Sequence, residues 1–346
     1  MTQRSAIGSL IAIAAIVGGA ALAFAYTAGW FSPDRLRPER YLAALQPSAG
    51  PALGHRRNHA KGICFTGVFS SNGAGAALSK AQLFTEGRYP VTGRFSLASA
   101  NLAAADGSTR VRALAFRIVS PDGQEWRSGN ISAPFFPVGT PDAFLDLLVS
   151  SGSEDPGAMP AFAARHPEIA AFGAWAKAAP WTGSYAEERY NGLNAFIFTD
   201  ASGADHPVRW SLLPKDQPVD VSADELAKRS PNFLEQEIAE RVSRGPVSWT
   251  MAVAMANQDD PIADPSKAWP DGRRTIEVGM LTVQQVEPEP DGPCREINFD
   301  PAVLPVGIRT SEDPFPAARS AVYAKSYDRR TAEASKYPAT PAGAKR

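Results

Sequence analysis

Residues 314–330 read "PFPAARSAVYAKSYDRR" and place charge beside an aromatic side chain near the end of the chain. The stretch predicts a short helix that carries Arg319, Tyr323 and Arg330. Arg319 and Tyr323 are four residues apart, the helical spacing that brings two side chains together. One interpretation is a solvated surface helix. The other is that Tyr323 is a phenolate, held ionised by Arg319 and by a strong positive charge in front of it.

The composition excludes several classes of site. The chain has 346 residues and a net charge of −1, which gives no electrostatic basis for binding nucleic acid. It contains four histidines and two cysteines without a CxxC or HExxH motif, so a closed zinc site is not expected. Cys64 and Cys294 could form one disulfide in an exported domain. The sequence leaves open whether they approach closely enough.

Residues 1–31 predict an N-terminal membrane anchor. Within them, residues 6–26 are apolar and reach the roughly 20 residues that a membrane-spanning helix needs. A signal peptide is the alternative, because "ALAFA" could serve as a small-residue cleavage site. We favour the anchor, since the apolar stretch is longer than the core of a signal peptide.

The charges around this span bear on its orientation. Arg4 precedes the span, whereas Arg35, Arg37 and Arg40 follow it, which argues against export by simple counting. Large domains are nevertheless exported despite such charges. We therefore expect an anchor in the cytoplasmic membrane with the following domain on the periplasmic side.

The rest of the chain predicts one large domain. Residues 32–53 resemble a Pro-punctuated linker with one short helix, residues 54–330 carry the folded domain, and residues 331–346 have the composition of a disordered tail. β-Branched and aromatic residues predict single strands at 59–69 and 91–99. Two more strands are expected on either side of a Pro-Asp-Gly turn within 108–132, followed by a hairpin over 194–214. A last pair of strands is expected at 248–257 and 274–286.

Helical patterns lie between these strands. They cover residues 73–84, 140–151, 159–180, 222–229 and 232–242, and Ser222 with Glu225 forms a capping box at the start of the fourth. Strands toward both ends with helices between them indicate the α+β class. The specific expectation is an antiparallel β-barrel with helical insertions, preceded by one transmembrane helix.

Three short stretches could carry chemistry. In "RRNHAKG", residues 56–62, strand alternation would place Arg57, His59 and Lys61 on one face, although a structural histidine is the simpler interpretation. In "GRFSLAS", Arg94 and Ser96 likewise share a face.

The third stretch is "SGNISAPFF", in which Asn130 lies just ahead of two aromatic residues. Alone it is weak, because Gly-Asn usually marks a turn.

Taken in order with the 314–330 helix, these stretches resemble the catalase superfamily of haem proteins, and in particular its truncated branch, the catalase-related peroxidases. The resemblance covers about residues 54–330. No single motif is specific, but five occur in the family's order. The matching residues are Arg56, His59, Ala60, Lys61 and Gly62; Arg94, Phe95 and Ser96; Asn130, Phe135 and Phe136; Arg319 and Tyr323; and Arg330.

The resemblance implies a heme b cofactor whose iron is bound by Tyr323. Tyrosine is the axial ligand of catalase haem, and both ferric iron and the guanidinium of Arg319 favour its phenolate form. The remaining cofactor contacts implied by the family are Arg56, Arg94 and Arg330 at the haem propionates and Phe135 against the porphyrin.

The resemblance also implies a reaction with peroxide. His59 would accept a proton from one peroxide oxygen and deliver it to the other, so that water leaves. Asn130 would donate a hydrogen bond that holds the peroxide, and Ser96 would orient the His59 imidazole and fix its tautomer. The expected function is a peroxidase that uses hydrogen or organic peroxide to oxidise small organic donors, with weak catalase activity.

The chain departs from typical catalases in ways that limit this expectation. Only 16 residues follow Arg330, so we do not expect the wrapping segment and helical domain of large catalases, nor a bound NADPH. A non-catalytic haem carrier or sensor, and an enzyme that processes lipid hydroperoxides, remain as alternatives. Cys64 is interpreted as a strand packing residue rather than a redox centre.

Overall fold

A computed structural model describes residues 3–27, 30, 37–46, 50 and 52–336. The chain divides into two compact units, residues 1–37 and 38–346. The first contains helix α1, Gln3–Thr27. Within the described residues, α1 is the one helix long and apolar enough to cross a membrane, over Leu10–Thr27, and a signal sequence would have the same properties. The length and composition of α1 agree with the expected anchor, but they do not distinguish an anchor from a signal sequence.

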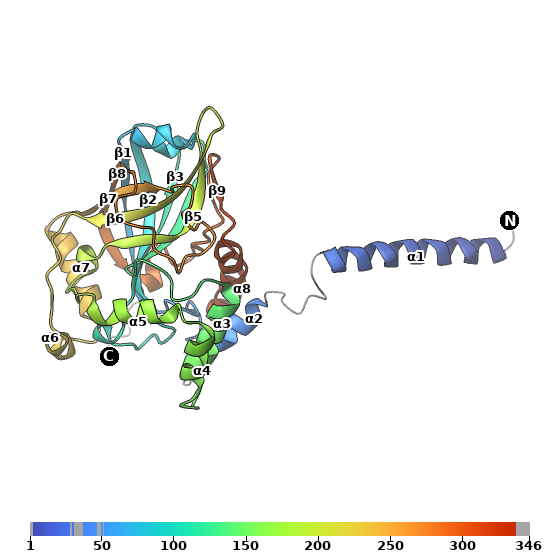
Figure 1. Cartoon of the computed structure of the whole chain (residues 1–346), viewed down its shortest axis with the longest axis horizontal. Coiled ribbons are helices and arrows are strands. Elements are labelled where there is room, and N and C mark those ends of the chain that lie inside the picture. Colours follow the sequence, from blue (N-terminus) through green and yellow to red (C-terminus); the bar gives the residue numbers. More distant parts are fainter. Residues whose placement is uncertain (1–2, 28–29, 31–36, 47–49, 51, 337–346) are drawn as a thin grey trace. The chain divides into compact units, whose positions relative to one another are not determined.

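The second unit is built around an antiparallel β-barrel (Figure 1). The strands follow the order β4-β3-β2-β1-β8-β7-β6-β5-β9, and β4 also pairs with β5 through Ile131 and Asn191, which closes eight strands into a barrel. The strands are β1 Gly62–Ser71, β2 Gly87–Leu97, β3 Arg112–Val119, β4 Glu125–Ile131, β5 Tyr190–Thr199, β6 Asp205–Pro214, β7 Val247–Met255, β8 Thr275–Pro288 and β9 Ile308–Thr310.

The barrel closes over an aromatic core. Phe95, Trp126 and Trp249 are fully buried there, and the rings of Trp126 and Trp210 meet edge to face at 4.9 Å. Such offset contacts add to the free energy gained by burying the rings. Gly93 of β2 permits this packing, because a Cβ at that position would lie 2.1 Å from the ring of Phe65.

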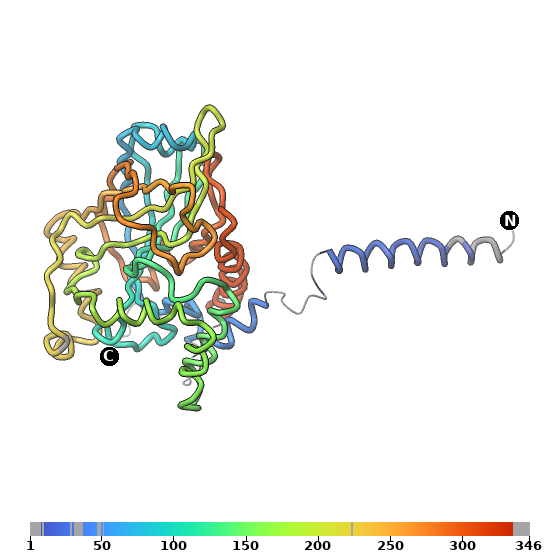
Figure 2. The backbone as a smooth tube through the Cα atoms, in the orientation of Figure 1, coloured from blue at the N-terminus to red at the C-terminus, as the bar shows by residue number. Residues whose placement is uncertain are grey.

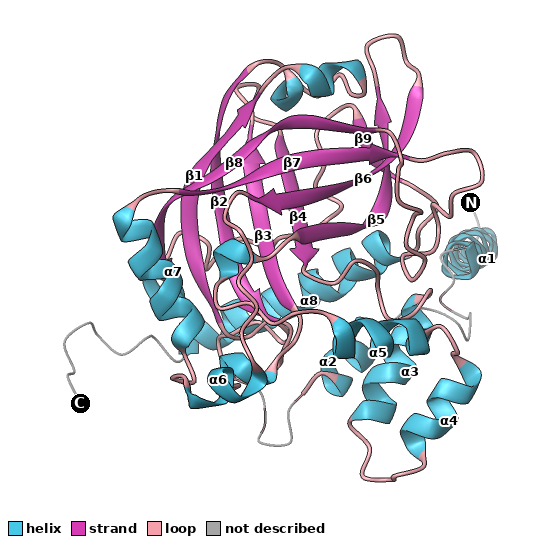
Figure 3. Cartoon of the chain, turned by 60° about the vertical axis from the view of Figure 1, so that its left-hand side comes forward, coloured by secondary structure: helices cyan, strands magenta, loops and turns pink. Residues whose placement is uncertain are grey.

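Helices gather at one end of the barrel, where α2, α3, α4 and α5 lie together (Figure 3). Thr140 caps α3 by accepting a hydrogen bond from the Ala143 amide, and the predicted Ser222–Glu225 capping box is present at the start of α6. The helices of the domain are α2 Pro38–Ala44, α3 Pro141–Ser151, α4 Ala158–Arg165, α5 Ile169–Ala178, α6 Ala223–Lys228, α7 Phe233–Arg244 and α8 Phe315–Lys336. Short 3₁₀ helices are η1 Ala74–Ala77, η2 Gln82–Phe84, η3 Asp106–Ser108, η4 Tyr185–Glu187 and η5 Glu289–Asp291.

The two ends of the domain meet in space. Helix α2 packs against α8 and α3, so the blue and red parts of the tube lie side by side (Figure 2). Tyr41 and Leu42 of α2 are buried in this contact. The helix expected within a linker is therefore part of the folded domain.

Several sequence-based boundaries were wrong. The strand expected from His59 begins at Gly62, so strand alternation does not place Arg57, His59 and Lys61 on one face. Residues 73–84 form η1 and η2 rather than one α-helix.

Helix α8 runs to Lys336, so residues 331–336 are helical rather than part of a disordered tail. The remaining tail, residues 337–346, lies outside the described residues, as do residues 28–29, 31–36, 47–49 and 51 of the expected anchor and linker.

The disulfide that the sequence left open is present. Cys64 of β1 and Cys294, which follows η5, are bonded with their Cα atoms 5.3 Å apart. Both residues are fully buried, as expected of a packing residue at Cys64, but their covalent bond gives them a further structural role.

We predict that removing residues 1–37 leaves the stability of the domain unchanged, whereas removing residues 1–45 lowers it. The longer deletion removes Tyr41 and Leu42, and burial of two such side chains contributes about 3–5 kcal/mol. Chemical denaturation of the two truncated proteins, each measured without added cofactor, tests this. Equal unfolding free energies for both proteins would show that α2 contributes no stability to the domain.

Candidate functional site

A cavity of about 230 Å³ lies where the barrel meets α8 and α2. Its wall contains side chains from the loop before β1, from β2, β4 and β5, and from α8. Of the residues predicted to act in the site, eight line this cavity and Phe135 does not. The eight are Arg56, His59, Arg94, Ser96, Asn130, Arg319, Tyr323 and Arg330.

Tyr323 and Arg319 project from α8 into the cavity as a pair. The Arg319 guanidinium approaches the Tyr323 hydroxyl oxygen through Nη2 at 3.2 Å and Nε at 3.4 Å. The same guanidinium donates from Nη1 to Asn194 Oδ1 at 3.0 Å. A cation therefore lies beside the phenol oxygen, in the arrangement that the four-residue spacing predicted.

Asn194 continues a chain of contacts that sequence reasoning missed. Its Nδ2 donates to Asp313 Oδ2 at 2.8 Å, and Asp313 Oδ1 accepts from the Phe315 amide where α8 begins. Burial raises the pKa of Asp313 above its ordinary value. Asn194 has no sequence signal, since it lies more than a hundred residues from its partners. Asp313 stands just before α8, and that helix-start position was the available signal.

His59 lies in the loop before β1 in a left-handed backbone conformation, with φ at 53°. Few non-glycine residues adopt this conformation, and such outliers cluster at functional sites. The amide of His59 donates to Asn58 Oδ1 at 2.9 Å, and its Nδ1 lies 3.3 Å from Ser96 Oγ. The predicted Ser96–His59 contact is therefore present, although β1 does not include His59.

The ionisation of His59 is shifted strongly. Its side chain is accessible only in part, and protein surrounds it. This burial, with Arg94, Arg319 and Arg56 nearby, lowers its pKa from 6.5 to about 3. The imidazole is therefore neutral at neutral pH and can accept a proton.

Asn130 is fully buried in β4 and held from three sides. Its Nδ2 donates to the Leu114 carbonyl at 3.0 Å, while its Oδ1 accepts from Trp210 Nε1 at 2.9 Å and from Ser128 Oγ at 3.0 Å. These bonds fix the amide and use one of its two N–H groups. The other N–H is available to a group in the cavity.

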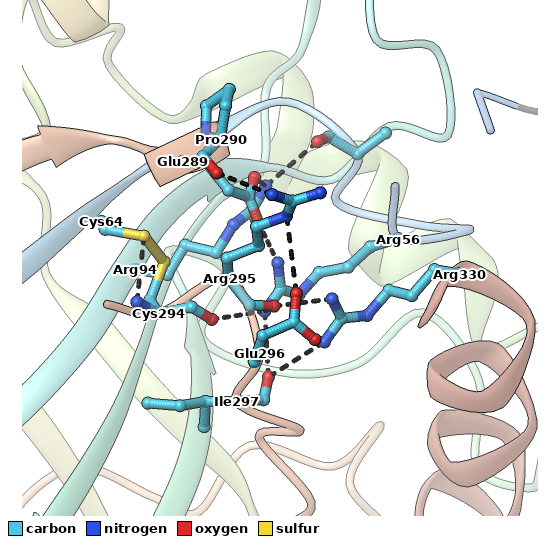
Figure 4. Close-up of a disulfide and its surroundings, with 11 residues drawn as sticks. Arg56, Cys64, Arg94, Glu289, Pro290, Cys294, Arg295, Glu296, Ile297 and Arg330 are labelled. Atoms are coloured by element: carbon cyan, nitrogen blue, oxygen red, sulfur yellow. Dashed lines mark hydrogen bonds and ion pairs between the residues drawn. A yellow bond between two sulfur atoms is a disulfide. The ribbon is translucent and has the colours of Figure 1, made fainter. Parts of the chain in front are cut away.

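Three arginines converge at one side of the cavity. Arg56 and Arg94 both form ion pairs with Glu289, the latter at 2.5 Å, while Arg330 donates to backbone carbonyls (Figure 4). Burial lowers the pKa of Arg94 to about 10 and shifts the pKa values of Arg56 and Arg330 downward. Gly62 makes room for this cluster, since a Cβ there would lie 2.7 Å from the Arg94 guanidinium carbon.

The aromatic wall differs from the prediction by one residue. Phe136 lines the cavity and packs edge to face on Phe315, with ring centroids 4.9 Å apart. Phe135 instead contacts Phe172 of α5 at 6.5 Å. The contact of Phe135 with the porphyrin stays a prediction; it is Phe136 that lines the cavity, because spacing along the sequence does not determine which side of an irregular segment faces inward.

The donor set of this cavity suits haem. Among the described residues no three His, Cys, Asp or Glu side chains come together as a metal cluster. Haem iron needs only axial ligands from protein, and the oxygen of Tyr323 is of that kind. Arg94 Nε is buried and finds no hydrogen-bond partner among the described residues, which suits an added carboxylate.

Comparisons with known proteins agree with this geometry. The family model for catalase matches residues 50–341. A catalase-related peroxidase from Synechococcus elongatus is 34% identical over 93% of this chain and 95% of its own length. A catalase-related peroxidase from Mycolicibacterium paratuberculosis is 31% identical over 86% of this chain and 95% of its own length.

Solved structures are similar in fold. Catalase A from Saccharomyces cerevisiae aligns with a TM-score of 0.71 at 17% identity over 80% of this chain, and a bacterial catalase with 0.70 at 19% identity over 89%. The chain spans about three fifths of these two catalases, 61% and 60% of their lengths. With the family model matched over most of its length, the chain belongs to the catalase family.

Proposed function

We propose that the protein is a haem peroxidase that uses hydrogen or organic peroxide to oxidise small organic donors, with weak catalase activity. One observation carries the proposal: a single cavity brings neutral His59 and buried Asn130 together with the Tyr323–Arg319 pair. The naming of both relatives as catalase-related peroxidases supports it.

Tyr323 would bind the iron of heme b. When bound, the haem supplies the electron transfer that reduces the peroxide O–O bond. Arg319 lies against the phenol oxygen and favours the phenolate that ligates iron. Asn194 and the Gly129 carbonyl accept from the same guanidinium and so keep it aimed at Tyr323.

His59 would move the proton during peroxide cleavage. Its neutral imidazole accepts a proton from one peroxide oxygen and returns it to the other, which leaves as water. Ser96 Oγ, at 3.3 Å from Nδ1, orients the ring. The free N–H of Asn130 donates to the peroxide and holds it in the cavity.

The arginine cluster would bind the acidic edge of the cofactor. Arg56, Arg94 and Arg330 carry three positive charges; Glu289 pairs with the first two, and Glu296, which also acts on Arg56 and Arg330, is itself paired with Arg295. Two propionates would balance this excess, and charge-assisted pairs of this kind are strong. An NADPH site is not part of the proposal.

The location and domain plan follow from α1. We place residues 1–31 in the cytoplasmic membrane as an anchor, residues 32–37 as the connection and residues 38–336 as the periplasmic haem domain. The Cys64–Cys294 disulfide supports an oxidising compartment. An enzyme for lipid hydroperoxides is the second candidate, favoured by the apolar helix that precedes the domain.

Replacing Tyr323 by Phe should remove most of the bound haem. Loss of the iron-binding oxygen is expected to weaken retention by at least about tenfold, the scale seen when groups around a metal are lost. The haem-to-protein ratio of the purified variant, measured by absorbance, tests this. Tyr327→Phe on the same helix is the matched control and should keep its haem. Full haem content with an unchanged spectrum in the Tyr323 variant would refute the ligand assignment.

Replacing His59 by Ala should leave haem bound but slow the reaction with peroxide. General acid–base help of this kind contributes about 10²–10⁴-fold. Stopped-flow mixing of the ferric protein with peroxide measures this rate. A variant that reacts as fast as the native protein would remove His59 from the mechanism.

The low pKa of His59 predicts an unusual pH profile. Because the pKa of His59 is about 3 rather than 6.5, the imidazole stays neutral and the rate with peroxide should not change from about pH 5 to 8. A rate that halves near pH 6.5 would contradict the shifted pKa.

The same shift affects stability, because protonation of buried His59 opposes folding. The stability that neutral His59 contributes is complete above pH 6.5 and declines as the pH falls toward 3.

Donor oxidation should dominate over oxygen release. With aromatic donors present, we expect most peroxide to be consumed in donor oxidation and only modest oxygen evolution. Initial rates of both, measured at equal peroxide with protein that lacks residues 1–37, test the proposal. Vigorous oxygen release without donor oxidation would indicate a catalase. Conversion of a fatty-acid hydroperoxide to a rearranged product without any donor would favour the second candidate.

A further inference from the structure

The Cys64–Cys294 disulfide fixes a turn rather than the sheet. Cys64 already pairs with Glu287 of β8 in the ladder between β1 and β8, and Cys294 lies seven residues beyond Glu287. The pairing of β1 with β8 therefore does not require the bond, because Cys294 lies beyond the end of β8. What the bond secures is the segment that leaves β8, residues 287–299, here called the clamp segment.

The carboxylate of the clamp segment organises two arginines. Glu289 is buried. One of its carboxylate oxygens pairs with Arg56, which lies in the loop before β1, and the other oxygen lies 2.5 Å from Arg94 of β2 (Figure 4). Since Arg94 is buried and Arg56 is partly buried, this carboxylate offsets part of the cost of keeping them charged.

Backbone carbonyls of the clamp segment also accept hydrogen bonds from the arginines, including Arg330 of α8. Arg56 donates to the carbonyls of Cys294 and Ile297, each at 3.0 Å. Arg330 of α8 donates to the carbonyl of Arg295 at 2.6 Å. One of these acceptors belongs to a disulfide cysteine, so the bond acts directly on the groups that hold the arginines.

The disulfide is fully buried beneath a turn that carries exposed residues. Gly292 packs over Cys64, where a Cβ would lie 2.6 Å from the sulfur. Pro290, Asp291 and Pro293 of the same turn are exposed. Opening this short turn would expose the sulfur atoms while the barrel remains closed.

We propose that the Cys64–Cys294 bond is a redox latch on cofactor retention. While it is closed, the clamp segment holds the three arginines in position to grip the carboxylates of haem. A dithiol opens it by thiol–disulfide exchange: the S–S bond breaks, two thiols form, and the dithiol is oxidised to a cyclic disulfide as it supplies two electrons and two protons. The released segment no longer positions the arginines, and haem leaves faster. This proposal rests on the proposed haem site.

The test measures transfer of haem from the loaded protein to excess apomyoglobin. Three samples are compared: the oxidised protein, the same protein after dithiothreitol, and the Cys64→Ala/Cys294→Ala variant. The last two should lose haem at least about tenfold faster than the first, the scale expected when supporting groups around a metal cofactor are lost. Dithiothreitol should not change the rate of the double variant, which controls for any direct action of the thiol on iron.

Two further comparisons separate the latch from general loosening of the fold. Val253→Ala lowers stability in the barrel core away from the cavity and should not speed haem loss. Oxidised glutathione should restore slow haem loss to the reduced native protein. Equal transfer rates for the oxidised protein and the double variant would overturn the latch, as would equal acceleration by Val253→Ala at matched stability. Failure of the oxidised protein to bind haem at all would instead overturn the proposed function.

Discussion

The contact between the Arg319 guanidinium and the Tyr323 oxygen is the constraint around which the site is arranged. It requires a helix at that position, because the four-residue spacing brings the side chains together only there. It also requires the barrel, since Asn194 of β5 and the Gly129 carbonyl of β4 hold the guanidinium in place. A Cβ at Gly129 would lie 2.9 Å from that guanidinium, so even the backbone of β4 is fitted to it. The pair thus links the end of the chain to strands that precede it by more than a hundred residues.

Burial and nearby positive charge together determine the ionisation of His59. Burial, together with Arg94, Arg319 and Arg56, keeps His59 neutral, so two of the arginines proposed to hold the cofactor, Arg56 and Arg94, also leave the imidazole free to accept a proton. The same charges would repel one another without the carboxylate of Glu289 and the carbonyls of residues 287–299. In the proposed mechanism, cofactor binding and proton transfer would both depend on this electrostatic balance.

The barrel and the helical insertions could be predicted from periodic patterns, which report local preferences, and most of the cavity-lining residues from the resemblance of short motifs to the catalase superfamily. Long-range and irregular features could not. The strand pattern around His59 predicted alternation, but the chain there adopts a left-handed conformation that no pattern of apolar residues encodes. Phe135 and Phe136 are the same residue type and are adjacent, so the sequence does not show which of them faces the cavity. In the structure Phe136 does, and it packs against Phe315. Asn194 gains its role from a partner 125 residues away, which sequence spacing does not reveal.

The central claim is that the Tyr323 oxygen binds iron as a phenolate. Resonance Raman spectra of the ferric protein, prepared with ordinary and with ring-deuterated tyrosine, test it most directly. If Tyr323 binds the iron, the spectra will contain bands of an iron-bound tyrosinate that shift on deuteration and that disappear in Tyr323→Phe. Spectra without any isotope-sensitive tyrosinate band, from a protein that nevertheless holds a full complement of haem, would contradict it.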